Sequence, residues 1–523
     1  MIIKPLFISA RSACIELPLK GYYHADEPAG LRLNEADYGQ ADRVVTSLFG
    51  LAPDTAYHLE MLQKGRLAAE VRFRTKAEFV TLNVRDFGAF GDGTHDDTAA
   101  IQAAILCCPK ESRVLVPTGK YLVSPLFLKS HLRLEIQKGA QLRLHPAREE
   151  SPILPGMIPS WDEKSEYNLG TWEGNPLSMH AALLTAVDAH DIEVYGEGVL
   201  DGQAAKGDWW LEPKVKKSGA WRGRMVFLNR CQNVTLQGLT ITNSPSWNVH
   251  PYFSKDLVLL DLSIQSPSDS PNTDGINPES CRDVLISGAR LSVGDDCIAI
   301  KSGKIYMGAT YKTPTERVTI SHCLMENGHG GVTIGSEMAG GVRDILVTDC
   351  RMLRTDRALR IKTRRGRGKQ GVIDRIHFEN VKMIDIPVPI AINSFYHCDP
   401  DGHAENVQDK EARPADDGTP VIGALSFNNV VATGCRHVAV YALGLPEKKI
   451  RRIAITNSRF SFAEEKVVPA RPVMADGVEL CAKRGLIAHN VENLALSDVA
   501  FGGTVGETLE LHGVDSLIKE DEL

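Results

Sequence analysis

The sequence predicts an all-β protein in which a long parallel β-helix follows a small β-sandwich. Three observations support this prediction: a ten-residue pattern recurs along most of the chain, apolar and polar residues alternate inside each copy, and the first 77 residues follow a different pattern. Alternating segments are typical of strands with one buried face, and recurring units of this kind indicate a stacked repeat architecture. We therefore expect two domains, residues 1–77 and 78–523.

The first domain is expected to be the β-sandwich. Short alternating runs such as Glu70–Thr75 predict strands, and Leu51–Tyr57 has the form of a tyrosine corner before a late strand. These features resemble a fibronectin type III module. A structural spacer and a substrate-binding module are both open roles for it.

The second domain begins with a loop rich in glycine and aspartate, residues 86–98, and a short helix, residues 99–105. A helix at this place covers the end of the coil, where strand edges would otherwise be exposed. This arrangement resembles the entry of pectin-lyase-like right-handed β-helices. The glycine-rich loop lacks the lysine and hydroxyl pair of a phosphate-binding loop.

The repeat has the pattern polar, polar, apolar, any, apolar, any, small or polar, any, any, apolar. Its copies start at irregular intervals, which argues against propeller blades and suits a parallel β-helix, whose turns vary in length. Ten segments fit the pattern: His190–Val199, Gln232–Ile241, Lys255–Ile264, Arg282–Leu291, Glu316–Met325, Arg343–Met352, Asp374–Met383, Gly423–Ala432, Arg451–Phe460 and Glu492–Phe501.

The composition is that of an ordinary globular protein, with 43% hydrophobic and 24% charged residues and a net charge of −7. The acidic balance gives no basic surface for nucleic acid, and no apolar run is long enough to span a membrane. We expect a cytoplasmic protein, because no signal peptide is recognisable; a processed chain would be periplasmic or secreted. Eleven scattered cysteines favour reduced thiols. The oligomeric state is open.

Four polar clusters interrupt the repeats in the middle of the chain. They are Asn272–Gly275, Gly294–Cys297, Gly328–Gly331 and Arg360–Lys362.

The clusters are spaced in step with the repeat. Asp295 lies 13 residues after the repeat start Arg282, and His329 lies 13 residues after the repeat start Glu316. Equal offsets in successive coils place side chains on the same face of the coil, one coil apart. The sequence therefore predicts a groove that crosses neighbouring coils, about 15 Å long for four coils.

The residue types indicate acid and base chemistry on an anionic sugar polymer. Glycoside hydrolysis needs a carboxylic acid and a carboxylate, and Asp274, Asp295 and Asp296 can divide these tasks. Repulsion among them raises the pKa of one carboxyl group. Arg360 and Lys362 point to the same side of a strand and suit a sugar carboxylate.

Four further cations follow this pair, within residues 364–369. A local binding site for a polyanion and a solvated loop are both open interpretations of this segment.

The four clusters, in this order on a β-helix repeat, resemble glycoside hydrolase family 28, the polygalacturonases. The resemblance covers roughly residues 80–510. It implies that Asp295 is the general acid and that Asp274 and Asp296 position and activate water in an inverting single displacement. His329 would support the acid.

The resemblance also implies a set of substrate-binding residues. Arg360 and Lys362 would bind the galacturonate carboxylate at the cleavage point, Asn272 would shape the site, and Tyr396 would contact substrate. No metal and no cofactor are implied.

Two further residues are candidates for substrate binding, each with a structural alternative. His250, close to Trp247, could face the sugar chain or form a structural Trp–His pair. Lys301 could meet a second carboxylate or serve packing alone. The long insertion of residues 145–180, which includes Trp161 and Trp172, is expected to close one end of the groove.

The leading hypothesis is an exo-acting hydrolase of α-1,4-linked galacturonan. Two alternatives remain on the same fold: a rhamnogalacturonan or xylogalacturonan hydrolase, and a pectate lyase whose aspartates bind calcium. A β-helix that binds polysaccharide without cleaving it is the alternative from another class.

Overall fold

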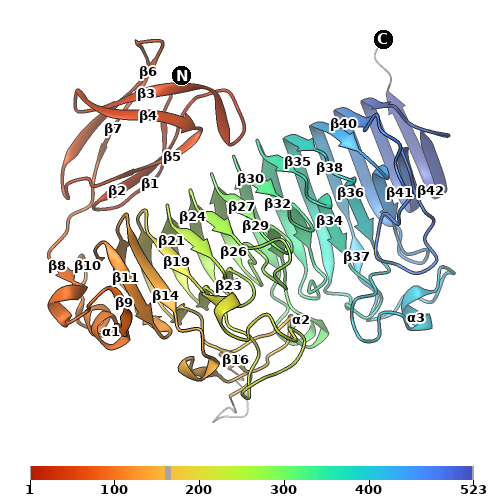
Figure 1. The fold of residues 1–523 in the computed structure, drawn as a ribbon. Coiled ribbons are helices and arrows are strands. Elements are labelled where there is room, and N and C mark those ends of the chain that lie inside the picture. The colour runs from red at the N-terminus through yellow and green to blue at the C-terminus, as the bar shows by residue number, and fades with distance from the viewer. Residues whose placement is uncertain (1, 159–166, 521–523) are drawn as a thin grey trace.

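The computed structural model describes residues 2–158 and 167–520. A small antiparallel domain at the N-terminal end lies against one side of a long coil of parallel strands (Figure 1). Strand β7 of the small domain ends at Arg74, and the first strand of the coil begins at Thr81.

The small domain contains a three-stranded and a four-stranded antiparallel sheet with the orders β1-β2-β5 and β4-β3-β6-β7. Apolar side chains from both sheets, such as Leu31, Leu48 and Met61, form its core. The Tyr57 hydroxyl accepts a hydrogen bond from the Ala52 amide at 2.8 Å, the local contact expected of a tyrosine corner. Its relation to fibronectin type III modules stays a prediction. The strands are β1 (Lys4–Ile8), β2 (Ser12–Glu16), β3 (His24–Leu33), β4 (Ala36–Arg43), β5 (Val45–Phe49), β6 (Ala56–Gln63) and β7 (Arg66–Arg74).

The coil has three strand-lined faces, which we call the first, second and third sheets. Each sheet is a stack of parallel strands from successive turns. The first sheet contains β8 (Thr81–Asn83), β10 (Arg113–Val116), β13 (Leu132–Ile136), β18 (His190–Tyr195), β21 (Gln232–Gln237), β24 (Lys255–Leu260), β26 (Arg282–Ser287), β29 (Thr315–Ser321), β32 (Val342–Thr348), β35 (Val372–Ile384), β38 (Ala424–Cys435), β40 (Ile450–Phe462), β41 (Arg484–Gly502) and β42 (Leu509–Glu520).

The longest strands pass around a corner of the coil from one sheet to the next. The second sheet contains the later parts of β35, β38, β40 and β41, together with β9 (Asp92–Asp96), β11 (Gly119–Val123), β14 (Ala140–Leu144), β19 (Val199–Asp201), β22 (Thr240–Thr242), β25 (Ser263–Gln265), β27 (Arg290–Ser292), β30 (Leu324–Glu326) and β33 (Arg351–Leu353).

The third sheet carries the polar clusters at its strand ends. It contains the start of β41, together with β12 (Leu126–Leu128), β17 (Leu184–Val187), β20 (Val226–Asn229), β23 (Val249–Tyr252), β28 (Ile298–Ile300), β31 (Val332–Ile334), β34 (Arg357–Lys362), β36 (Val388–Asn393) and β39 (Val438–Leu443). Isolated bridges join Ile276 to Val249 and to Ile298, so the chain near Ile276 supplies a turn between β23 and β28.

Helices and short strands occupy the ends and edges of the coil. Helix α1 (Thr98–Cys107) buries Ile101, Ala104 and Ile105 against the first turns, as expected for a helix that closes the coil. The remaining elements are α1 (Thr98–Cys107), α2 (Ile305–Tyr311), α3 (Glu405–Gln408), the 3₁₀ turns η1 (Val84–Phe87), η2 (Arg148–Glu150) and η3 (Ala204–Lys206), and the strands β15 (Ile153–Leu154), β16 (Met179–His180) and β37 (Val421–Ile422).

The strand register confirms the predicted repeat. His190 pairs with Gln232, Gln232 with Lys255, and Lys255 with Arg282, and the later repeat starts continue the same row. Apolar template positions point inward and form one continuous core along the coil.

Turns before residue 190 also belong to the coil, although the template missed them. Between β13 and β14, Gln141 lies six residues after Glu135. In the next coil Tyr195 pairs with Glu135 and Val199 pairs with Gln141, but Val199 lies only four residues after Tyr195. The extra two residues break the ten-residue pattern without breaking the strand pairing.

The small domain packs on the outer surface of the first sheet. The Ser12 hydroxyl donates to the Gln237 side chain at 2.9 Å, and Arg43 forms an ion pair with Asp261. Cys14 and Leu260 belong to one buried apolar cluster at this contact. Within the described residues, no helix is long and apolar enough to cross a membrane.

Candidate active site

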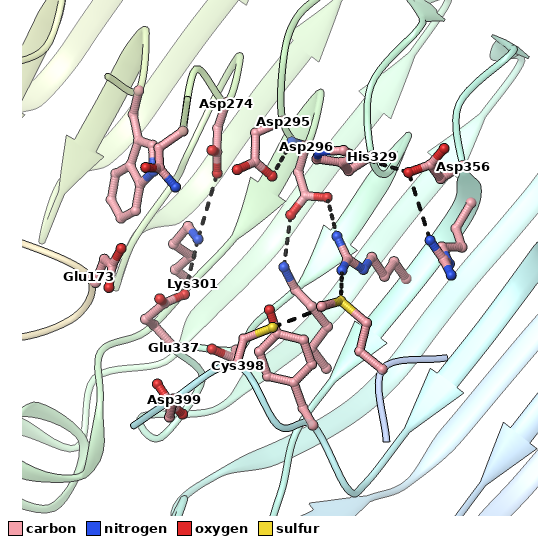
Figure 2. A pocket seen from close by; sticks show the side chains of 18 of the residues that line it. Glu173, Asp274, Asp295, Asp296, Lys301, His329, Glu337, Asp356, Cys398 and Asp399 are labelled. Carbon is pink, nitrogen blue, oxygen red and sulfur yellow. Dashed lines mark hydrogen bonds and ion pairs between the residues drawn. The ribbon is translucent and has the colours of Figure 1, made fainter. Parts of the chain in front are cut away.

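A cavity of about 350 Å³ lies along the third sheet (Figure 2). Nine of the ten predicted site residues line it: Asn272, Asp274, Asp295, Asp296, Lys301, His329, Arg360, Lys362 and Tyr396.

The strand register explains why residues from separate turns meet in this cavity. Ile298 pairs with Val332, which pairs with Leu359. The residues three positions earlier, Asp295 and His329, therefore occupy the same place in successive coils. This row is the one that the equal offsets in the sequence predicted.

Asp296 is a buried carboxylate held between two cations. Its Oδ1 accepts a hydrogen bond from Arg360 Nη1 at 3.1 Å, and its Oδ2 accepts one from Lys362 Nζ at 2.9 Å. Burial alone would raise the pKa of this carboxyl group, but the charges of Lys362 and Arg360 outweigh burial and hold the pKa well below its usual range. Asp296 is therefore an anion at any working pH.

Asp274 is equally buried but has weaker partners. The Asn277 side-chain amide donates to its Oδ2 at 2.8 Å, and Lys301 Nζ stands 3.7 Å from the same oxygen. Burial and the neighbouring charge of Asp295 raise the pKa of Asp274 to about 7. The sequence predicted one elevated carboxyl among the three, and the structure places the elevation on Asp274.

Asp295 is more exposed to the cavity than its two neighbours. The Asp296 amide donates to its Oδ1 at 3.0 Å. In the next coil, His329 Nδ1 lies 2.8 Å from Asp356 Oδ2. This hydrogen bond raises the pKa of His329 against the opposing effect of burial, and the charge of Asp295 adds to the increase. His329 can therefore carry a proton beside Asp295.

Lys301 lies at the centre of a buried charge network under the cavity. Its Nζ is 3.0 Å from Glu337 Oε2, and it stands 4.5 Å from the centre of the Trp247 ring. Burial would lower the pKa of Lys301, but Glu337 and Asp274 reverse that effect and raise it. Lys301 thus lines the cavity as a cation, and its positive charge offsets the negative charge of the surrounding carboxylates.

Asn272 and Tyr396 add uncharged polar side chains to the cavity lining. Asn272 adopts the left-handed backbone conformation, with φ of 55°, and its Oδ1 accepts a hydrogen bond from Arg222 Nη2 at 2.6 Å. The Lys362 ammonium stands 5.5 Å from the centre of the Tyr396 ring. Both side chains are only partly buried and reach the cavity.

The prediction that His250 faces the substrate is wrong. Its side chain is fully buried, and its Nε2 lies 2.9 Å from Glu279 Oε2. Its ring meets the Trp247 ring edge to face at 4.8 Å. The residue therefore takes the structural alternative, because strand β23 turns it into the protein, behind the cavity.

The interpretation of residues 364–369 as a polyanion site is also wrong, because carboxylates of the protein already pair with these cations. Arg364 binds Asp399 and Asp401, Arg365 binds Glu447, Arg367 binds Asp399, and Lys369 binds Asp417. Their partners come from residues 399–447, too far along the chain for the sequence to show the pairing.

Several cavity residues were missed by sequence reasoning. Asp356 and Arg357 could have been found, because they stand immediately before and at the start of β34, at the same register positions as Asp295 and Asp296. The insertion contributes Glu173 to the lining, and Trp172 is buried in a stack with Trp221; Trp161 lies outside the described residues. The other missed residues carry no signal in the sequence: Lys214, Ser336, Glu337, Cys398, Asp399 and Met474.

Comparison with known families places this cavity in a defined group of proteins. Residues 110–410 match the model of the glycosyl hydrolases family 28, and residues 81–135 match a model described as rhamnogalacturonase A/epimerase, pectate lyase-like. A probable polygalacturonase of Vitis vinifera is 29% identical over 425 residues, which are 80% of this chain and 82% of the relative. Other curated relatives are named as endo- or as exopolygalacturonases.

Two solved structures share the fold. An exopolygalacturonase from Thermotoga maritima matches with a TM-score of 0.63 and 26% identity, covering 84% of this chain and 94% of that one. A family 28 exopolygalacturonase from Yersinia enterocolitica matches with a TM-score of 0.74 and 19% identity, covering 100% of this chain and 98% of that one. These matches confirm the prediction of a pectin-lyase-like right-handed β-helix.

Proposed function

Because this chain belongs to the glycosyl hydrolases of family 28, we propose that it hydrolyses α-1,4 bonds between galacturonate units by an inverting single displacement. One observation carries the proposal. In a single cavity, Asp296 is fixed as an anion between Arg360 and Lys362, while burial and the charge of Asp295 raise the pKa of Asp274 to about 7, so that Asp274 and Asp295 together hold one proton near neutral pH. An acid and a base can therefore coexist near neutral pH.

The proton chemistry is assigned to Asp274 and Asp295 as a pair. The two carboxyl groups interact, so one proton belongs to both of them. In the active form Asp295, the more exposed of the two, carries this proton and donates it to the leaving glycosidic oxygen as the C–O bond breaks. The water that attacks the anomeric carbon gives its proton to ionised Asp274, whose elevated pKa makes it a competent base.

The remaining residues bind and orient. Asp296 accepts a hydrogen bond from the attacking water and does not change its own protonation. The substrate carboxylate is bound by the outward faces of Arg360 and Lys362, since a guanidinium and an ammonium form strong charge-assisted hydrogen bonds with it. His329, charged through Asp356, orients Asp295 and stabilises it as an anion after proton transfer.

We further propose that the enzyme attacks chain ends. The insertion of residues 145–180 supports this mode, because Glu173 from the insertion and Lys214 form an ion pair and both line the cavity. A wall at one end of a groove stops the polymer from passing through, and only a terminal unit then reaches the acids. The Thermotoga maritima relative that carries the name exopolygalacturonase agrees with this mode.

The arrangement around Asp296 does not favour the calcium-dependent lyase. Both Asp296 oxygens already bind cationic side chains, which would repel a divalent ion at the same place. A lyase also leaves an unsaturated product that absorbs ultraviolet light, whereas hydrolysis leaves a new reducing end and no such absorption.

The test is incubation with polygalacturonate, following reducing ends, product sizes and ultraviolet absorption over time. The proposal expects mono- or digalacturonate from the earliest time points and no rise in absorption. A rapid fall in viscosity with mixed oligomers would refute the exo mode. Unsaturated products would refute hydrolysis itself.

A further inference from the structure

A cluster of two histidines and one carboxylate lies beside the substrate cavity and has no part in the reaction above. We propose that His397, His403 and Asp476 bind a divalent transition metal ion such as Zn²⁺, and that the ion fastens together two loops that line the cavity. Histidine nitrogen and carboxylate oxygen are established zinc donors, and three protein ligands leave one position for water.

The ligand atoms already stand close to the spacing that a metal requires. His397 Nδ1 is 3.1 Å from Asp476 Oδ1, and His403 Nδ1 is 2.8 Å from Asp476 Oδ2. The two imidazole rings lie 4.5 Å apart. Ligand atoms around a tetrahedral zinc ion are about 3.3 Å apart, so small side-chain rotations would admit the ion.

The loop that carries both histidines is shaped independently of any metal. The Gly402 amide donates to the Asp399 carbonyl at 2.8 Å, and Arg364 binds the carboxylates of Asp399 and Asp401 at 3.1 and 2.7 Å. A Cβ atom on Gly402 would stand 2.0 Å from the His397 carbonyl oxygen, so only glycine allows the chain to double back here. This hairpin brings two histidines six residues apart in sequence into ring contact.

The third ligand comes from a different loop, and Gln408 joins the two loops. The Asp476 amide donates to Gln408 Oε1 at 2.9 Å. Gln408 Nε2 donates in turn to the carbonyl oxygens of Phe395 and Gly402, at 2.8 and 2.7 Å. The backbone that carries Asp476 is therefore held against the histidine loop by the Gln408 side chain, and binding a metal would cost little further ordering of the chain.

Both loops form part of the cavity wall. Tyr396 and Cys398, the neighbours of His397, line the cavity, and so does Met474, two residues before Asp476. Arg360 Nη2 also contacts Met474 Sδ at 3.0 Å. An ion that joins these loops would fix the wall next to the arginine that is assigned to the substrate carboxylate. This consequence rests on the proposed function, whereas metal binding itself does not.

The described residues contain two other groups with metal-ligand spacing, and one of them provides a control. His131, His190 and Asp191 also bring their ligand atoms within 4.8 Å of one another. The second Asp191 oxygen, however, accepts a hydrogen bond from Asn233 at 2.6 Å, and these residues do not line the cavity. His190→Ala therefore removes a comparable exposed histidine at a remote place.

The experiment measures Zn²⁺ binding to the full, tag-free chain by competition with a chromophoric chelator, in the absence of substrate. His403→Ala and Asp476→Ala are expected to lose the tightest site, with affinity reduced at least about tenfold. His190→Ala is expected to retain it. Because no substrate is present, the result does not depend on the glycosidase assignment.

A second measurement tests the fastening of the loops. Amide hydrogen exchange in residues 396–408 and 472–478 is expected to slow when Zn²⁺ is added to the wild-type chain and to His190→Ala, but not to His403→Ala. Wild-type zinc affinity in both His403→Ala and Asp476→Ala would overturn the site. Zinc binding without slower exchange in these segments would overturn the role in joining the loops.

Discussion

Lys362→Met tests whether the cations around Asp296 stabilise its buried charge or only line the cavity without contributing to the stability of the fold. Lys362 Nζ stands 2.9 Å from Asp296 Oδ2, and the two side chains are 9% and 2% exposed. Breaking a buried ion pair costs about 3–5 kcal/mol, because the remaining charge is left without its partner. Arg360 still binds Asp296 at 3.1 Å, so we expect a loss near the lower end, about 3 kcal/mol.

Lys369→Met is a matched control for this substitution. Lys369 Nζ lies 3.0 Å from Asp417 Oδ1, almost the same separation, but the side chains are 60% and 87% exposed. Water screens this pair, so its removal is expected to cost less than about 1 kcal/mol. The assay is urea unfolding of both variants beside the wild-type chain, compared through the transition midpoints.

The pH dependence adds a second check on the same variant. Asp296 has a lowered pKa in the folded chain. Its ionised carboxylate therefore stabilises the fold at pH values above about 3.9, the pKa of aspartate in an unfolded chain, and this stabilisation is lost as the pH falls toward the pKa of the folded state. Lys362→Met brings the pKa of Asp296 in the folded chain back toward its unfolded pKa and reduces this pH-dependent stabilisation. The stability gap should therefore be full at neutral pH and narrow below about pH 4. Equal losses for Lys362→Met and Lys369→Met would refute the argument from burial.

The remaining predictions concern catalysis and the corrected residues. Asp295→Asn is expected to lower kcat by about 10²–10⁴-fold, measured by reducing-end release, with an unchanged circular dichroism spectrum. The kcat/KM of the wild-type enzyme should fall as pH rises through about 7, because the shared proton is then lost; a constant value up to pH 9 would contradict this account. Arg365→Met should lower stability by about 3 kcal/mol while KM for oligogalacturonate stays within about twofold, since its charge is used by Glu447. His250→Gln should also destabilise the fold, by about 1–3 kcal/mol, without changing KM, and a large rise in KM would restore a substrate role.

The row that contains Asp295 and His329 could be predicted from the sequence because the strands of successive turns in a parallel β-helix pair in register. When strands stack in register, equal offsets from equivalent starts give equivalent positions, as the pairing of Arg282 with Glu316 shows. The same rule would have found Asp356, which continues the row in the coil of β34. That residue was missed because an isolated aspartate before a strand has no motif around it.

Residues supplied by loops were not predictable in this way. Glu337 joins Lys301 from a turn after β31, and Asp399 reaches the cavity from the loop after β36. Their positions depend on turn lengths and on contacts between loops, which follow no period. The cations of residues 364–369 were misjudged for the same reason. In the sequence Arg365 has no nearby acidic partner and looks free to bind an anion, but in the structure it is paired with Glu447, 82 residues away.

The three faces of the coil separate the tasks of this chain. The small domain contacts Gln237 and Asp261 on the first sheet, whereas the acids precede strands of the third sheet and the cations Arg360 and Lys362 lie within β34. Among the described residues, none from 2–77 lines the cavity. A polymer in the cavity therefore meets only the coil and its loops, so at the cleavage point specificity must come from the insertion and from the loops after β19, β31, β36 and β40. The small domain instead covers apolar side chains such as Leu260 that the first sheet would otherwise expose to water, which favours the structural role among the two left open by its sequence.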